Sequence, residues 1–86
     1  MGKLLFIINP RAGKAQIKFR LLEIVDLFVK SGWQVEIHTT QAPMDAMETV
    51  RDRGGQADLV VCSGGDGTLS ETISGMMKLE RPPALG

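Results

Sequence analysis

The chain has 86 residues, of which 43% are hydrophobic and 23% are charged, and its formal net charge is zero. A chain of this length forms one small domain at most and buries little more than about 60% of the surface that it exposes when unfolded. The neutral charge and the ordinary composition argue against bulk nucleic-acid binding and against intrinsic disorder.

The only cysteine, Cys62, excludes an internal disulfide and favours a reducing compartment. The longest early apolar run, Leu4–Ile8, is too short for a signal peptide, and no run is long enough to span a membrane. We therefore expect a cytoplasmic protein whose membrane association, where it has one, is peripheral. The oligomeric state stays open, with a homo-oligomer among the alternatives.

Residues 1–20 contain five basic residues and no acidic one: Lys3, Arg11, Lys14, Lys18 and Arg20. This asymmetry favours either a basic surface that attracts phosphate near the first loop or a solvated helix face.

The first unit starts with a strand over Leu4–Ile8 and a turn-rich loop over Asn9–Lys14. Apolar residues then recur at helical spacing and predict a helix that ends at Ser31-Gly32. The residues expected on its buried face are Ile17, Leu21, Val25, Phe28 and Val29.

The second unit starts with Gln34–Thr39, where apolar and polar residues alternate as in a more exposed, edge strand. His38 and Trp33 are assigned to strand structure and packing, because neither has a partner in the sequence that suggests acid–base chemistry. A helix is predicted from about Asp45 to Arg53, with Asp45 as its N-cap and Gly54-Gly55 as its end.

The third unit has a short apolar strand over Asp58–Cys62, a loop over Gly64–Thr68 and a helix over Leu69–Met77. A connector follows, and Ala84–Gly86 looks like the start of a fourth strand. Regular alternation of strands and helices predicts a three-layer, Rossmann-like α/β fold with a parallel sheet. Because the last strand is incomplete, we expect a truncated domain, the front piece of a longer protein.

The loop over Gly64–Thr68 carries the clearest chemical signal. Gly64, Gly65 and Gly67 permit positive φ and allow a ligand to reach the main chain. A loop of this kind at the N-terminus of a helix is an anion site, most often for phosphate. Asp66 in its centre would repel phosphate unless a cation lies between them, which suggests metal–nucleotide chemistry.

Simpler roles exist for several of these residues. Thr68 and Glu71 have the spacing of a capping box, and on the residues alone a cap is the favoured role of Glu71. Asn9 either ends the first strand or belongs to the site, and Lys14 is assigned to solvent. The sequence lacks a complete Walker A loop, and the dinucleotide fingerprint fails at Ser70.

Two segments together resemble the catalytic domain of the diacylglycerol kinase family, which includes sphingosine, ceramide and bacterial lipid kinases. They are the run Gly64–Glu71 and the early loop Asn9–Lys14. The sequence departs from the family pattern at Ser70, where Asn is usual. It departs again at Met44, where Gly is usual, and this second departure bears on the shape of the loop near Thr40.

The resemblance implies an ATP- and Mg²⁺-dependent kinase that acts on a lipid hydroxyl, with ATP and the lipid as partners. It implies that Asp66 faces the phosphates and Mg²⁺ as the catalytic and metal-binding residue. The candidate ATP-binding residues are Asn9, Thr40, Gly64, Gly65, Asp66, Gly67, Thr68 and Glu71. The chain would form the N-terminal part of the catalytic domain, without its remainder or the C-terminal domain. The general base and the lipid pocket would lie beyond Gly86, so residues 1–86 alone are expected to be inactive.

Two alternatives remain at this level. NAD kinases contain the same Gly-Gly-Asp-Gly turn, although the loop over Asn9–Lys14 favours the lipid branch. The other alternative is a non-catalytic module, which would bind a nucleotide through the same loop but would not transfer a phosphoryl group.

Overall fold

The computed structural model describes residues 2–11 and 16–86, and for residues 16–19 it describes the backbone alone. The described part contains four strands, all paired in parallel in the order β2-β1-β3-β4. Their bounds are Lys3–Ile8 (β1), Gln34–Thr39 (β2), Leu59–Ser63 (β3) and Ala84–Leu85 (β4).

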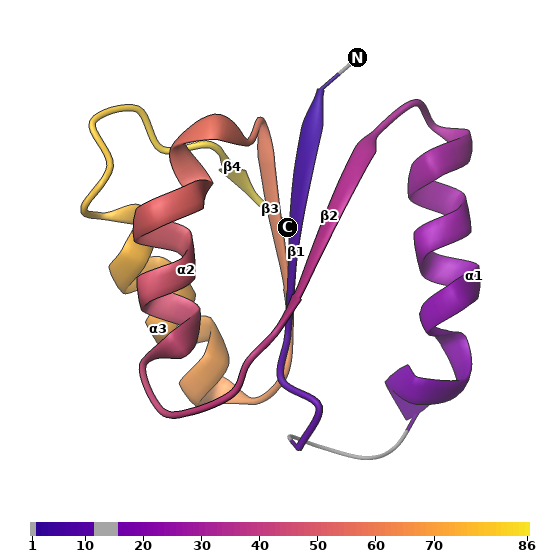
Figure 1. Cartoon of the computed structure of the whole chain (residues 1–86), viewed down its shortest axis with the longest axis horizontal. Coiled ribbons are helices and arrows are strands. Elements are labelled where there is room, and N and C mark those ends of the chain that lie inside the picture. Colours follow the sequence, from indigo (N-terminus) through magenta and orange to yellow (C-terminus); the bar gives the residue numbers. More distant parts are fainter. Residues whose placement is uncertain (1, 12–15) are drawn as a thin grey trace.

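The helices are Gln16–Lys30 (α1), Asp45–Arg53 (α2) and Asp66–Met76 (α3), with a short 3₁₀ turn over Gly54–Gln56 after α2. Helix α1 covers one face of the sheet, and α2 and α3 cover the other (Figure 1). These three layers confirm the predicted α/β fold. Each strand-to-helix loop leaves the sheet at the carboxyl ends of the strands, at the bottom of Figure 1.

Strand β1 forms the centre of the core, because its side chains alternate between the two faces of the sheet. Leu4, Phe6 and Ile8 pack beneath α1, where the rings of Phe6 and Phe28 meet edge to face at 5.7 Å. Leu5 and Ile7 pack on the opposite face against α2 and α3. All of Leu4–Ile8 is buried, which explains why this segment is a continuous apolar run.

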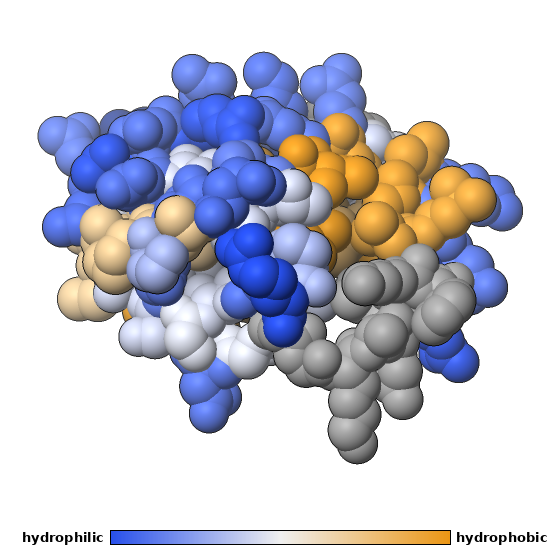
Figure 2. Space-filling model, turned by 60° about the horizontal axis from the view of Figure 1, so that its bottom comes forward, coloured by the Kyte–Doolittle hydropathy of each residue, from blue (hydrophilic) through white to orange (hydrophobic). Residues whose placement is uncertain are grey.

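The two helical layers are packed differently. On α1, Leu21, Val25 and Phe28 contact the core as predicted, but none of them is fully buried. Val29 was predicted on the buried face and is instead 54% exposed, because it lies on the flank of the helix; Ile17 lies among the undescribed side chains. Apolar surface gathers on the side of the molecule that holds α1 in Figure 2.

The edges of the sheet agree with the sequence pattern. Strand β2 lies at one edge, and Trp33 just before it packs in the α1 layer. The expected start of a fourth strand is present as β4, which pairs with β3 through Leu59–Ala84 and Val60–Leu85.

The opposite layer is tighter, since Ala46, Val50 and Thr72 are completely buried between α2, α3 and the sheet. Gly75 permits this contact: a Cβ there would lie 2.6 Å from the carbonyl oxygen of Met47. Helix α2 has the predicted bounds, but the predicted N-cap is wrong. Met44 is the N-cap and makes no side-chain cap, while Asp45 is already the first helical residue.

Candidate functional site

Three loops meet at the carboxyl edge of the sheet and enclose a cleft of about 280 Å³. This convergence is what a parallel sheet predicts, because the loops that follow neighbouring strands lie at the same edge. The residues that line the cleft are Asn9, Arg11, Thr40, Ala42, Pro43, Gly67, Thr68 and Glu71. Figure 2 shows this edge turned toward the viewer, with hydrophilic residues and residues of intermediate hydropathy on it.

Gly64 follows β3 and lies close to the side chains of Thr68 and Asn9. A Cβ at this position would lie 2.5 Å from Oγ1 of Thr68 and 3.2 Å from Cβ of Asn9. No side chain fits in that space without moving its neighbours. Of the three loop glycines, Gly64 alone has a positive φ.

Gly65 and Gly67 differ from Gly64, because a Cβ at either position would meet no described atom within 4 Å. Gly65 has φ −85° and Gly67 lies in the first turn of α3, so neither needs glycine for its backbone conformation. The packing of the described residues therefore does not explain why these two positions lack a side chain. They leave a bare stretch of main chain open to solvent.

Helix α3 begins at Asp66, with Gly65 as its N-cap and no side-chain cap. The first N–H groups of a helix have no partner within it, and the helix dipole places partial positive charge at the same end. Asp66 itself is exposed in this first turn. The end of α3 next to the cleft therefore offers N–H donors and a carboxylate side by side.

The predicted capping box of Thr68 and Glu71 is wrong, because α3 starts two residues before Thr68. Thr68 is buried, and its Oγ1 accepts a hydrogen bond of 3.3 Å from Nδ2 of Asn9. Its carbonyl oxygen accepts one of 2.8 Å from Oγ1 of Thr72. The threonine therefore ties the first loop to the glycine loop, and the side chain of Glu71 is left to line the cleft.

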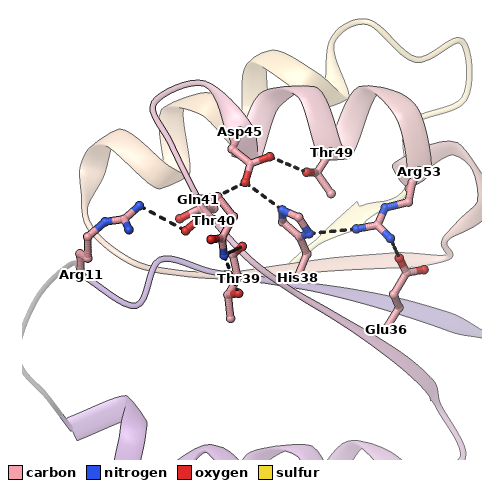
Figure 3. Close-up of polar contacts among 9 residues, drawn as sticks. All are labelled: Arg11, Glu36, His38, Thr39, Thr40, Gln41, Asp45, Thr49 and Arg53. Carbon is pink, nitrogen blue, oxygen red and sulfur yellow. Dashed lines mark hydrogen bonds and ion pairs between the residues drawn. The ribbon is translucent and has the colours of Figure 1, made fainter.

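Thr40 forms the other side of the cleft. It is 5% exposed, and its N–H donates to the carbonyl oxygen of Ile8 at 2.8 Å, which continues the pairing of β2 with β1. Nη2 of Arg11 donates to the carbonyl oxygen of Thr40 at 3.3 Å (Figure 3). Arg11 thus reaches from the first loop to the second and places a positive charge at the cleft.

A chain of polar contacts continues from this loop along α2 (Figure 3). Oδ2 of Asp45 lies 2.7 Å from the backbone N of Gln41 and 2.9 Å from Nε2 of His38, and its Oδ1 accepts from Oγ1 of Thr49 at 3.2 Å. Nδ1 of His38 lies 3.0 Å from Nη2 of Arg53, which is also paired with Glu36.

This arrangement gives His38 two polar partners, Asp45 and Arg53, in addition to the strand and packing role expected from the sequence. A guanidinium can only donate, so Nδ1 of His38 accepts and Nε2 carries the proton that goes to Asp45. The hydrogen bond from His38, followed by that from the N–H of Gln41, holds the pKa of Asp45 below its ordinary value of 3.8. The carboxylate is therefore charged at neutral pH.

Cys62 lies in β3, partly buried and packed against the core. Burial raises the pKa of its thiol, and a hydrogen bond with Thr72 opposes this rise. A protonated thiol is a packing group, so Cys62 contributes volume beneath the site. Lys14, at the end of the first loop, lies outside the described residues.

The cleft contains five of the candidate residues inferred from the sequence: Asn9, Thr40, Gly67, Thr68 and Glu71. Gly64, Gly65 and Asp66 belong to the adjoining glycine loop but do not line it. Three lining residues were not singled out as site residues: Arg11, Ala42 and Pro43. Their position in the sequence could have indicated them, since each lies in a loop that directly follows a parallel strand.

The sequence profile of the diacylglycerol kinase catalytic domain matches residues 3–86. The chain belongs to this family. The diacylglycerol kinase of Bacillus subtilis (strain 168) is 30% identical over 87 residues, and that of Staphylococcus aureus (strain MRSA252) is 33% identical over 81 residues. These alignments cover 100% and 93% of this chain.

Solved structures give the same result. A crystal structure of a diacylglycerol kinase from Bacillus anthracis str. Sterne superimposes on 96% of this chain with a TM-score of 0.83 and 32% sequence identity. The chain covers 30% of that structure, 29% of the B. subtilis protein and 26% of the S. aureus protein. In the described part of the chain, no helix has the length and apolar character needed to cross a membrane.

Proposed function

We propose that this diacylglycerol kinase family chain supplies the nucleotide-phosphate loop of a lipid kinase, which transfers a phosphoryl group from ATP to a lipid hydroxyl. Diacylglycerol is the leading substrate class. The observation that carries the proposal is the bare main chain at Gly65 and Gly67, beside the N-terminus of α3. A phosphate that contacts the backbone there would account for two glycines that the packing around them does not require.

The cleft beside this loop has groups that suit a nucleotide phosphate. The N–H donors of α3 would bind phosphate oxygens together with Arg11, whose planar guanidinium suits the same ligand. Asn9 and Thr40 add polar groups on the opposite side. Glu71 would accept hydrogen bonds from a hydroxyl or amine of the nucleotide, since it is an acceptor when ionised.

Asp66 is the residue proposed to act with Mg²⁺. Sites of this kind usually hold Mg²⁺ with one or two carboxylates together with phosphate oxygens. Asp66 is exposed, is not used as a cap and lies beside the proposed phosphate donors, so it fits such a site. Bound Mg²⁺ would neutralise charge on the transferring phosphoryl group. Within the described residues, no three His, Cys, Asp or Glu side chains are grouped to hold a metal ion.

Catalysis in such an enzyme is mostly positioning and charge neutralisation. This chain would orient the phosphates through the backbone of the glycine loop and exclude water from one side of them. The general base and the lipid pocket are proposed to lie in the region of the relatives that this chain does not match, so residues 1–86 alone would be inactive.

The test is the variant Asp66→Ala in a kinase that carries this chain as its N-terminal part. Turnover of ATP with diacylglycerol should fall by at least about a thousandfold, because the group that acts with Mg²⁺ is lost. Asp26→Ala is the matched control, since Asp26 is an exposed carboxylate of α1 that pairs with Lys30. Thermal denaturation should show that both variants are folded.

The assay is run in parallel with diacylglycerol and with NAD, using radiolabelled ATP. Labelled phospholipid supports the proposal, while label in NAD alone would assign the protein to the NAD kinase reaction. Turnover retained by Asp66→Ala would remove Asp66 from the mechanism.

A further inference from the structure

The segment of residues 40–44, here called the β2–α2 loop, forms one wall of the cleft through Thr40, Ala42 and Pro43. Its last residue, Met44, has φ 71° and ψ −3°, in the left-handed region. A residue with a Cβ is about 1–2 kcal/mol less stable there than in a right-handed conformation. The loop therefore depends on contacts elsewhere to keep this shape.

The carboxylate of Asp45 makes several of those contacts, beside the hydrogen bond from the N–H of Asp45 to the carbonyl oxygen of Ala42 and the one from Arg11 to Thr40. Its two oxygens receive hydrogen bonds from three structural elements: the β2–α2 loop through the N–H of Gln41, strand β2 through His38, and helix α2 through Thr49. Hydrogen bonds to a charged acceptor are stronger than those between neutral groups. Asp45 therefore fixes the loop to both elements that it connects.

His38 is oriented in turn by the next members of the chain of contacts. Arg53 donates to Nδ1 of His38, and Glu36 pairs with the same guanidinium. These contacts direct the Nε2 proton toward Asp45. Figure 3 shows the carboxylate between the imidazole on one side and the Gln41 backbone on the other.

We propose that Asp45 is a positioning residue for nucleotide binding. It acts through the N–H of Gln41 to hold the β2–α2 loop, and with it Thr40, in the shape that receives the ligand. This inference rests on the proposed function of the cleft as an ATP site. An ordered loop binds more tightly because less conformational entropy is lost when the ligand arrives.

A purely helical role makes a different prediction. An acidic residue in the first turn stabilises a helix through the dipole, and Glu48 of the same turn does so too. If Asp45 acted only in this way, its loss would lower the stability of α2 without changing the affinity of the folded protein for nucleotide.

The experiment is a titration of the ¹⁵N-labelled chain with MgATP, followed by NMR at 25 °C. Three proteins are compared: the unaltered chain, Asp45→Ala and Asp52→Ala. Asp52 is the matched control because it is an exposed carboxylate of the same helix and pairs with its neighbour Arg51. We expect Asp45→Ala to raise the Kd about tenfold and Asp52→Ala to change it less than about twofold.

A second readout follows the loop without ligand. Hydrogen exchange of the Gln41 amide should become faster in Asp45→Ala, while exchange in the β1 core stays slow. If Asp45→Ala is unfolded, Asp45→Asn replaces it. Asparagine has one acceptor oxygen for three donors, so the Kd should rise about threefold to fivefold.

The outcomes separate the two ideas. If the unaltered chain is folded and does not bind MgATP, the proposed function fails and this inference fails with it. If it binds and the Asp45 variant binds equally well while folded, only the inference is overturned. Weaker binding by both Asp45→Ala and Asp52→Ala would also overturn it, because the effect would then be one of general charge.

Discussion

The two loops that face each other across the cleft keep their shapes by opposite means. The glycine loop, Gly64–Thr68, depends on missing side chains: Gly64 makes room for Thr68 and Asn9, and Gly67 leaves the main chain bare. The β2–α2 loop contains no glycine. It has an unfavourable backbone conformation at Met44, and the N–H of Gln41 ties it to the carboxylate of Asp45.

This difference determines what each loop is sensitive to. Steric contacts do not depend on pH or salt, so the close contact at Gly64 should respond to side-chain volume and not to acid. Charge-assisted hydrogen bonds depend on protonation, so the β2–α2 loop should respond to acid and to removal of its carboxylate.

The largest effect is expected from adding one methyl group to the glycine loop. Gly64→Ala should lower the free energy of unfolding by about 2–3 kcal/mol, because its Cβ would overlap Oγ1 of Thr68. Gly67→Ala should change it by less than about 1 kcal/mol, since that Cβ enters open space. Urea denaturation followed by circular dichroism measures both values.

Gly67→Ala should have a small effect on stability but a large effect on nucleotide binding. Its methyl group would occupy the surface proposed to contact phosphate, so the Kd for MgATP should rise at least about tenfold in a protein of nearly unchanged stability. A Gly67→Ala protein that binds MgATP normally would show that the bare main chain is not the contact surface. Equal stability losses in the two variants would contradict the steric distinction between them.

A smaller effect is expected at Met44, the last residue of the β2–α2 loop. Met44→Gly should raise the free energy of unfolding by about 0.5 kcal/mol, because glycine adopts the left-handed conformation freely but has more entropy when unfolded. Met44 is 45% exposed, so little apolar burial is lost. Met44→Ala is the control, because alanine keeps the Cβ and with it the strain of the left-handed backbone. A gain in Met44→Ala equal to that in Met44→Gly would show that the backbone at Met44 is not strained.

Much of the fold could be predicted from the sequence because periodicity and turn residues agree along the chain. The bounds of β2 and α2 match their predictions, and β1 differs by one residue. The meeting of three loops at one edge follows from the parallel sheet, which is why several predicted site residues line the cleft.

The remaining features depend on contacts between distant segments. The sequence pattern predicts that Thr68 caps a helix. In the structure its side chain is buried, and its hydroxyl accepts a hydrogen bond from Asn9, 59 positions away in the sequence. Gly65 is the N-cap of α3, and because it has no side chain, no capping residue marks this helix start in the sequence. His38 gains its partners only when α2 folds over β2, so no local pattern indicates them.

The contribution of Asp45 at low pH is the smallest effect and the one most specific to the β2–α2 loop. Hydrogen bonds from His38 and from the N–H of Gln41 lower its pKa in the folded state, while in the unfolded chain it keeps the ordinary value of 3.8. As the pH falls, the unfolded state therefore takes up the proton first, and stability present above about pH 4–5 is lost as the pH passes below 3.8 toward the folded-state pKa. The charged or titratable groups that face this carboxylate are His38 of β2 and, behind it, Arg53 of α2 and Glu36 of β2.

Asp45→Asn removes this titration and keeps every other carboxylate. The stability difference between the unaltered chain and Asp45→Asn should therefore shrink as the pH falls through 3.8 toward the lower folded-state pKa, measured by urea denaturation at each pH. His38→Gln should weaken the same dependence, because it removes the largest cause of the lowered pKa. Gly64→Ala should show a constant difference from the unaltered chain over this range, since its effect is steric. A constant difference for Asp45→Asn as well would mean that the two loops are held by the same kind of force, and the contrast between them would be lost.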